Sequence, residues 1–507
     1  MKQKKIGIIL TYFNVVVGLL INIYLTPFLI HKLGDVDYSI YRVMQSFAGP
    51  LSMFHFGLSA IVTRCIVKSN TCNNYNKEDK SNSIAHALIS SAVMSLVVLF
   101  AGIIMLYLIP SIYGDNYSFS SVQMGQKLFF AFVLSTVFSI LTDTFSGCLV
   151  GHEQYVVSAA IPLVKNVVKV VLIIVLLRLG VGVYSVAIVD LFISVLVFAF
   201  CLLFSLFILN ERPKLTHWDK RQIIEITAFG VSILLQTIVN QVNNNVDTMI
   251  LGAVVSEKYI ITMYSSALTV YSVYNSIVSV MTNFFLPKAT KLITQNASGE
   301  QLTDFIIGPG RYQAIIGVAC ISGFALFGKN FISVWIGAKY IDAYYITLML
   351  IIPVTIPLVE NAALSILDAT LKRLYRSVVL VIMAVLNVLV SILLIKYIGF
   401  WGAALGTVVS LIIGHGFLMN IYYSKVFSIN IKRVFVEIFK EVLPIGIVSS
   451  IICIPIALFL PNTLLFFIIK AVLFLIVYCT GVWLFGLNKC EKNNVLSLIR
   501  SKHNSKA

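Results

Sequence analysis

Two lysines stand inside an apolar stretch of the chain, residues 155–177, where a charge needs a specific reason to be present. Lys165 and Lys169 are four residues apart, so on a helix they share one face with Ser158 and Pro162. Lys165 lies about ten residues into the stretch, or about 15 Å along a helix. That is near the middle of a hydrocarbon layer about 30 Å thick, where a charge costs about 3 kcal/mol.

Either an anionic ligand or an internal carboxylate would offset this cost. The compact ammonium group of lysine suits phosphate oxygens, so one interpretation is a cationic wall of a water-filled cavity that meets an anionic lipid diphosphate. The other interpretation is an ion pair with Asp143 or Asp190 that serves only helix packing. The sequence favours the cavity and leaves the ion pair open.

Two arginines are further candidates for this cavity. Arg42 lies near the start of the apolar stretch 40–63, and Arg311 follows the Gly-Pro-Gly sequence 308–310. Both lie close enough to a helix end for the side chain to reach the membrane surface instead. The predicted cationic substrate site therefore consists of Lys165, Lys169, Arg42 and Arg311.

Four acidic residues lie within or beside apolar stretches: Asp143, Asp190, Asp247 and Glu360. Carboxylates inside a membrane serve as proton or sodium sites, or as partners of buried cations. We predict ion coupling or charge pairing for this group, and we place Asp143 and Asp190 ahead of the other two. Asp247 is near a helix end and Glu360 is near the predicted cytoplasmic surface, so simple solvation is equally compatible with their positions.

A polar stripe runs along one predicted helix face in residues 232–247. A shift of 218 residues aligns it with a stripe on the first apolar stretch, and aligns Leu33-Gly34 with Leu251-Gly252. This register predicts two related halves, although any two helical hairpins can share polar faces and glycine turns. The residues predicted to line a cavity on these faces are Asn14, Asn22, Gln236, Asn240 and Asn244.

The composition excludes an ordinary soluble protein. Of the 507 residues, 59% are hydrophobic and 11% are charged, and the mean hydropathy is +0.94, whereas a soluble chain has about 25% charged residues. Apolar stretches of about 20 residues, each long enough to cross a bilayer as a helix, recur along the chain. They predict an all-α polytopic membrane protein with fourteen spans near 6–30, 40–63, 84–110, 128–150, 155–177, 184–208, 223–250, 260–286, 305–327, 343–366, 377–395, 401–424, 438–460 and 464–486.

The net charge of +16 follows the predicted topology. Of the 37 lysines and arginines, 25 fall on the side of the N-terminus, seven on the opposite side and five within spans. Because positive residues concentrate on the cytoplasmic side of membrane proteins, both termini are predicted to be cytoplasmic. The basic character therefore implies no nucleic-acid partner.

The repeat and the spans predict two pseudo-symmetric six-helix lobes followed by two extra C-terminal helices. A substrate site between repeated halves is usual in transporters. The predicted parts are an N-terminal lobe 1–209, a cytoplasmic linker 210–222, a C-terminal lobe 223–425, two additional spans 426–487 and a basic cytoplasmic tail 488–507.

Several kinds of chemistry lack sequence support. The chain has no GxxxxGK[ST] phosphate-binding loop, which argues against ATP hydrolysis. Its eight cysteines form no CxxC pair, and its seven histidines form no ligand cluster, so neither a disulfide nor a metal site is expected. No cofactor is predicted beyond coupling to H⁺ or Na⁺, and the protein is expected to be a transporter, not an enzyme.

Five segments, in order along the chain, resemble those of Wzx-type polysaccharide flippases of the multidrug/oligosaccharidyl-lipid/polysaccharide exporter superfamily. His55 and His152 depart from the residues more often found in that family. The five segments are LTPFLIHKLGDVDYSIYRV (25–43), FHFGLSAIVTRCI (54–66), GHEQY (151–155), VDTMILG (246–252) and FISVWIGAKY (331–340).

The resemblance implies alternating-access flipping of an undecaprenyl-diphosphate-linked oligosaccharide across the bacterial plasma (inner) membrane. The product would be O-antigen of a lipopolysaccharide, capsule or exopolysaccharide, and a polysaccharide polymerase with its chain-length machinery would be a partner. One alternative is an ion-coupled drug/cation antiporter of the same superfamily, which would need an acidic cavity. Another is a membrane-embedded glycosyltransferase or polymerase, which usually needs a large external loop that this chain lacks.

Overall fold

All regular structure in the part of the chain described by the computed structural model is helical, which confirms the all-α class. The predicted stripe residues Gln236, Asn240 and Asn244 lie outside the described residues. The structure describes residues 2–55, 58–71, 77–114, 116–216, 218, 245–279, 285–370, 374–488 and 491–492.

The helices form two compact units. Unit 1 comprises Met1–Ser265 with Ser391–Ala403, and unit 2 comprises Ser266–Val390 with Ala404–Ala507. The lobe and linker boundaries drawn from the sequence remain predictions.

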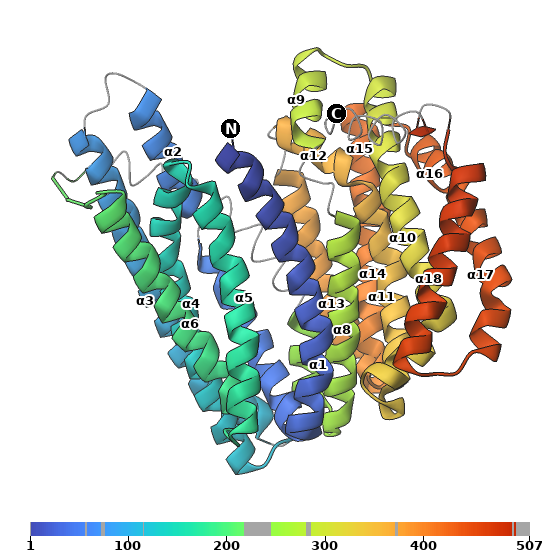
Figure 1. Ribbon diagram of the computed structural model, residues 1–507, viewed down its shortest axis with the longest axis horizontal. Helices are drawn as coiled ribbons and strands as arrows, with labels where there is room; N and C mark the ends of the chain where they lie inside the picture. The colour runs from blue at the N-terminus through green and yellow to red at the C-terminus, as the bar shows by residue number, and fades with distance from the viewer. Residues whose placement is uncertain are drawn as a thin grey trace, which may run out of the picture. The chain divides into compact units, whose positions relative to one another are not determined.

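In unit 1, α4 packs against α2, α3 and α6, while α5 packs against α1 and α6 (Figure 1). A Cβ atom on Gly147 of α4 would lie 2.6 Å from the backbone oxygen of Ser59 in α2, so the close approach of these two helices requires glycine. The elements are α1 (Lys2–Leu51), η1 (Ser52–His55), α2 (Leu58–Thr71), α3 (Lys77–Tyr113), α4 (Phe119–Gly151), α5 (Tyr155–Arg178), α6 (Tyr184–Leu203) and η2 (Phe204–Ile208).

The predicted turn between the first two spans is present within α1. Gly34 has a φ of 74°, and the helix continues on both sides of this kink. Side chains with a Cβ rarely adopt this backbone conformation, whereas glycine does so at little cost. The Leu33-Gly34 signal in the sequence therefore marks the point where the chain reverses from one span to the next.

In unit 2, α10 is the central helix and packs against α11, α16, α17 and α18. The elements from residue 258 onward are α8 (Lys258–Val278), α9 (Phe285–Thr294), α10 (Gly299–Trp335), η4 (Ala338–Tyr340), α11 (Asp342–Val359), α12 (Asn361–Ala369), α13 (Leu374–Ile398), α14 (Trp401–Leu411), η5 (Ile412–Met419), α15 (Asn420–Phe427), α16 (Ile431–Phe439), α17 (Val442–Phe459), α18 (Leu464–Gly481) and η6 (Val482–Gly486).

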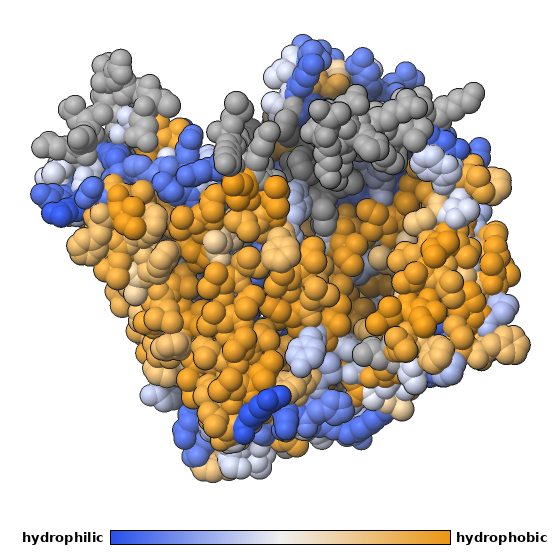
Figure 2. All heavy atoms as spheres, in the orientation of Figure 1, coloured by the Kyte–Doolittle hydropathy of each residue, from blue (hydrophilic) through white to orange (hydrophobic). Residues whose placement is uncertain are grey.

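Eleven helical segments in the described residues are long and apolar enough to cross a membrane. One of them, Ile9–Val67, covers most of the first predicted span and all of the second. Most of the seventh predicted span lies outside the described residues. α8, at the eighth predicted span, is not among the eleven. Figure 2 shows hydrophobic side chains along the flanks of the helices and hydrophilic side chains near their ends, as expected for a multi-pass membrane protein.

Candidate functional site

The face of α5 that carries the two lysines turns toward α6 and α4 at Lys169. Its Nζ atom lies 2.5 Å from Oδ1 of Asp190 in α6. The hydroxyl of Ser135 in α4 donates to the other carboxylate oxygen at 3.2 Å and lies 2.8 Å from the hydroxyl of Ser194. The ion pair that the sequence left open therefore exists for Lys169, and its partner is Asp190.

Lys165, one helical turn before Lys169, has a different environment. Its side chain is half-buried, and no hydrogen bond or ion pair connects it to any residue that the structure describes. Asp190 is close enough to act on it through its charge, but that carboxylate is already bonded to Lys169 and Ser135. Lys165 is thus the member of the pair whose ammonium group remains available to a ligand.

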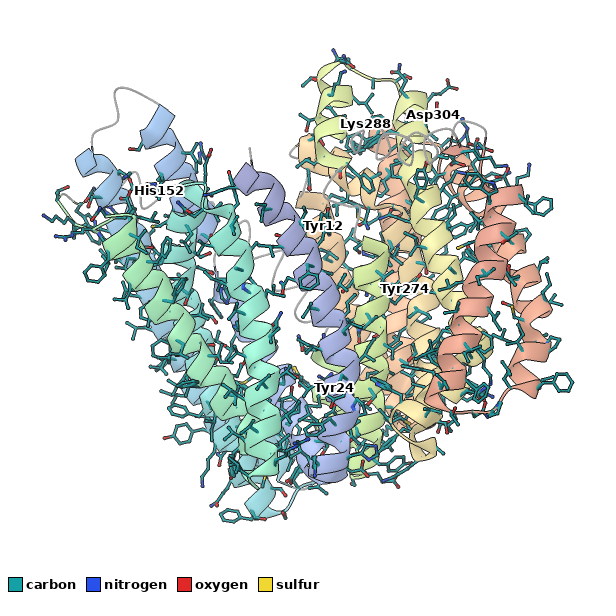
Figure 3. All side chains as sticks on the ribbon, viewed as in Figure 1. Tyr12, Tyr24, His152, Tyr274, Lys288 and Asp304 are labelled. Atoms are coloured by element: carbon teal, nitrogen blue, oxygen red, sulfur yellow. The ribbon has the colours of Figure 1, made fainter. Side chains whose placement is uncertain are left out.

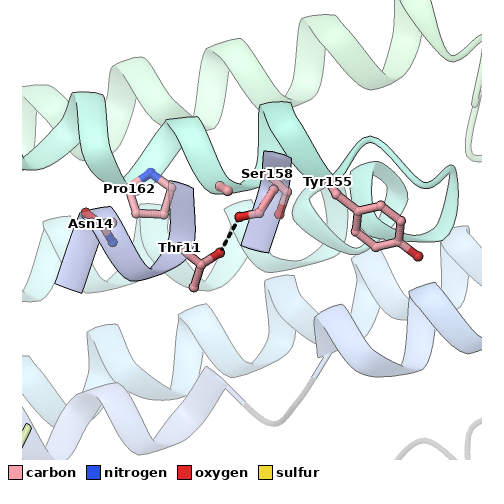
Figure 4. Close-up of a pocket in the computed structure, with 7 residues that line it drawn as sticks. Thr11, Asn14, Tyr155, Ser158 and Pro162 are labelled. Carbon is pink, nitrogen blue, oxygen red and sulfur yellow. Dashed lines mark hydrogen bonds between the residues drawn. The ribbon is translucent and has the colours of Figure 1, made fainter. Parts of the chain in front are cut away.

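A pocket of about 350 Å³ lies between α1 and α5 (Figure 4). Its lining includes Ser158 and Pro162, which share the lysine face of α5 and approach Lys165 along the helix. Asn14 also lines it and accepts a hydrogen bond of 3.1 Å from the amide of Asn166. The other lining residues are Gly7, Thr11, Tyr155 and Ala159.

The two predicted stripe residues on α1 have unequal environments. Asn14 lines the pocket, where the hydroxyl of Thr11 donates to the backbone oxygen of Gly7 at 2.9 Å. Asn22 is exposed, and its backbone oxygen accepts a hydrogen bond of 2.8 Å from Thr26. A ligand in the pocket would meet amide and hydroxyl groups, the types that bind sugar hydroxyls.

Arg42 lies in the part of α1 that follows the kink, and it is half-buried. Its guanidinium donates to Oε1 of Gln45 at 3.1 Å and to the backbone oxygen of Ser265 at 3.3 Å. Its Nε atom is buried without a hydrogen-bond partner. No carboxylate in the described chain pairs with Arg42, so its positive charge is retained within unit 1.

Asp143 does not pair with either lysine. Its Oδ2 atom lies 2.6 Å from Nδ1 of His55, and the two side chains are 27% and 33% exposed. His55 ends η1, the short 3₁₀ turn that follows Pro50. In the sequence, His55 stands out only as a departure from the family pattern, and the regular helix of α1 ends one residue after Pro50.

The other two acidic candidates are buried. Asp247 accepts a hydrogen bond of 2.5 Å from the hydroxyl of Tyr264. Glu360, at the junction of α11 and α12, is 4% exposed, and neither of its carboxylate oxygens has a hydrogen-bond partner in the described structure. Glu360 lies one residue beyond the candidate span Asp342–Val359, and burial raises the pKa of this carboxyl to about 8. Solvation at the surface, one prediction for Glu360, is therefore wrong.

Arg311 is engaged within unit 2. It is 6% exposed and donates to carboxylate oxygens of Glu441 at 2.8 Å and Glu491 at 3.0 Å. It also donates to the backbone oxygens of Glu437 and Gly486. The sequence suggested a cavity or a snorkelling role, but the structure gives Arg311 two carboxylate partners that hold the C-terminal helices to α10. It therefore leaves the set of residues proposed to meet a ligand.

A comparison with protein families supplies the classification. The profile of the family described as "Polysaccharide biosynthesis protein" matches residues 4–293, more than half of the chain. The chain belongs to the polysaccharide biosynthesis protein family. The matched range includes every element of unit 1 from α1 to η2, and with them both lysines of α5 and the α1–α5 pocket. No curated protein sequence matches this family member.

Solved structures with the same fold include a flippase and a MATE family transporter. The "Lipid II flippase MurJ, inward closed conformation" has a TM-score of 0.73 at 16% identity, over 94% of this chain and 97% of that one. An inward-facing "multidrug resistance MATE family transporter of the MOP superfamily" has a TM-score of 0.62 at 15% identity, over 81% and 94%. A MATE structure in complex with MaD3S has a TM-score of 0.56 at 14% identity, over 83% and 96%.

Together these findings confirm the predicted class: the family member is a polytopic membrane protein with the fold of MOP-superfamily flippases and transporters. Among the described residues, no group of three or more His, Cys, Asp and Glu side chains is arranged to hold a metal ion. Among the described residues of unit 1, the candidate polar groups for a ligand are the ammonium of Lys165, the guanidinium of Arg42 and the amides and hydroxyls of the α1–α5 pocket.

Proposed function

We propose that this protein flips an undecaprenyl-diphosphate-linked oligosaccharide across the bacterial plasma membrane by alternating access, with both termini in the cytoplasm. The family description concerns polysaccharide biosynthesis, and the solved structure with the TM-score of 0.73 is a lipid II flippase. The product of the pathway would be a surface polysaccharide such as O-antigen, capsule or exopolysaccharide, and a polysaccharide polymerase would act next.

The observation that carries this proposal is the unpaired ammonium of Lys165, which shares a face of α5 with Ser158 and Pro162 of the α1–α5 pocket. A half-buried lysine within a membrane span and without a carboxylate partner in the described structure needs an anion to offset its desolvation, and a diphosphate supplies one. Asp190 holds Lys169 one turn away, so the site keeps one free positive charge next to a neutral ion pair. Arg42, whose guanidinium also lacks a carboxylate partner, adds to the positive potential of unit 1.

The sugars would contact the amide-bearing faces. Asn14 and its partner Asn166 stand at the pocket, and Asn22 is exposed further along α1. Gln236, Asn240 and Asn244 are proposed to extend this polar lining from outside the described residues. Amides suit sugars because each one offers both a donor and an acceptor to hydroxyl groups.

Ion coupling is proposed at the buried or partly buried carboxylates. The carboxyl of Glu360 is buried, so the neutral acid is favoured, and a proton would be its natural ligand. The Asp143–His55 pair is a second place where a proton can reside, because a ring nitrogen and a carboxylate oxygen 2.6 Å apart can share one. Asp190 and Asp247 are already bonded to Lys169 and Tyr264, which makes charge pairing the better proposal for them.

The test is a strain that depends on this protein for surface polysaccharide. Lys165→Ala should abolish export while lipid-linked oligosaccharide accumulates in the inner leaflet and the protein inserts at normal levels. Lys165→Arg, which keeps the charge, should retain part of the export, and Lys127→Ala, at an exposed position, is the matched control. Normal surface polysaccharide in the Lys165→Ala strain would exclude a diphosphate site at this lysine.

A further inference from the structure

Residues 209–216, which follow η2, are hydrogen-bonded to the helices of unit 1. Beyond η2, residues 209–216 form no helix, yet their backbone groups are bonded. The amide of Lys214 donates to the hydroxyl of Ser81 at 3.0 Å, and the amide of Thr216 donates to the side-chain oxygen of Asn82 at 3.1 Å. The hydroxyl of Ser81 in turn donates to the backbone oxygen of Arg212. A loose surface loop would leave these groups to water.

Glu211 lies at the centre of these contacts. It is 5% exposed, and its Oε1 atom lies 2.7 Å from Nε2 of His152 and is also bonded to Nζ of Lys80. Its own amide donates to the backbone oxygen of Ser205 at 3.0 Å. One buried carboxylate therefore joins three parts of unit 1: the start of α3, the turn between α4 and α5, and the segment after α6.

The surroundings of Glu211 explain why a carboxylate can be buried there. Lys80 and His152 supply the donors, and Cys148 of α4 is the further titratable group that interacts with Glu211 and Lys80. Removing one member of such a buried group leaves the remaining charge without compensation, which is costly. Beyond the segment, the ring of Trp218 lies 5.6 Å from the ring of His86 in α3.

We propose that residues 209–216 are a clasp that fixes the point at which the chain leaves the helices of unit 1, and that Glu211 is the positioning residue of this clasp. His152 stands at the end of unit 1 where α4 gives way to α5 (Figure 3), so the fixed exit point is at that end of the helices. In a protein whose parts move during transport, an anchored exit transmits the motion of the helices to the chain that follows. The clasp itself does not depend on which cargo is carried.

Hydrogen–deuterium exchange of the full-length protein in detergent tests the clasp. The amides of Lys214 and Thr216 should be protected in the wild type, and Glu211→Gln should accelerate their exchange by about tenfold or more, since a local opening free energy sets the rate. Ser81→Ala with Asn82→Ala should have the same effect by removing the two acceptors. Glu257→Gln, the same substitution at an exposed residue, should leave the exchange of residues 209–216 unchanged.

Two results would overturn the clasp. One is exchange of residues 209–216 in the wild type at the rate of an unstructured peptide; the other is an unchanged rate in both Glu211→Gln and the Ser81/Asn82 double variant. If Glu211→Gln does not fold, the double variant decides alone, because it keeps the buried charges. The role of Glu211 is checked separately with Lys80→Met: the effects of Lys80→Met and Glu211→Gln on exchange should be non-additive, and strict additivity would remove Glu211 from this role.

Discussion

The ammonium of Lys169 lies 2.5 Å from a carboxylate oxygen of Asp190, whereas Lys165, one turn earlier on α5, has no carboxylate partner in the described structure. The two lysines look equivalent in the sequence because both stand on the same helix face within an apolar stretch. The packing of α6 against α5 makes them different, since Asp190 reaches one of them and not the other. The first prediction follows from this difference.

Asp190→Asn should destabilise unit 1, because Lys169 would keep its charge without a carboxylate. Loss of one partner of a buried pair costs about 3–5 kcal/mol; this pair is partly exposed, so we expect about 1–2 kcal/mol. The measurement is the thermal midpoint of the purified protein in detergent. Adding Lys169→Met should recover most of the loss, and a double variant less stable than Asp190→Asn alone would contradict the pairing.

Glu360 predicts a dependence of stability on pH. Its pKa is raised to about 8 in the folded protein from an ordinary value of 4.5, because burial disfavours the charged carboxylate. Between these values the folded state binds more protons than the unfolded state, so stability is fully present at low pH and falls as the pH rises to about 8.

The measurement is the thermal midpoint between pH 5 and pH 9 for the wild type and Glu360→Gln, which mimics the neutral acid. One pKa unit corresponds to about 1.4 kcal/mol. The thermal midpoint of the wild type should therefore fall with rising pH relative to that of the variant, by the equivalent of up to a few times this energy. Parallel curves for the two proteins would show that Glu360 ionises normally. Glu300→Gln, at an exposed residue in the first turn of α10, is the control.

For Lys258 we expect the opposite dependence, with stability that rises with pH. Its ammonium lies 3.3 Å from the centre of the Tyr117 ring and has no hydrogen-bond partner in the described structure, and burial lowers the pKa of Lys258 to about 8. Between about 8 and the ordinary value of 10.5 the unfolded state binds more protons, so stability should rise with pH over that range. Lys258→Met should flatten this rise in thermal midpoint, and an equally steep rise in the variant would assign the slope to other groups.

We expect the stability of the C-terminal helices to depend on the contacts of Arg311 in α10. Arg311→Met would leave Glu441 and Glu491 without their cation and two backbone oxygens without a donor, so we expect a loss of about 3 kcal/mol or more. Glu491→Gln removes one of the two carboxylates and should cost less. Limited proteolysis near residue 486 detects the release of the C-terminal helices from α10, and a fully resistant Arg311→Met protein would contradict this role of Arg311.

Much of the architecture followed from the order of residues. The apolar stretches predicted the membrane class, and Leu33-Gly34 predicted the reversal between the first two spans, because hydrophobic length and a left-handed backbone are local properties. The segments around 25–43 and 151–155 predicted the family that the comparison confirmed. Local sequence also identified Lys165 and Lys169 as charges that need a reason to be in a membrane.

Tertiary structure decided which charge meets which. Asp143 pairs with His55 across 88 residues, and Arg311 reaches Glu491 across 180 residues. Such pairs depend on the rotation and register of packed helices, which the periodicity of a single helix does not determine. The sequence therefore determined which residues carry charge into the membrane, while only the packed helices decided that Lys169 is paired and Lys165 remains free to meet an anion.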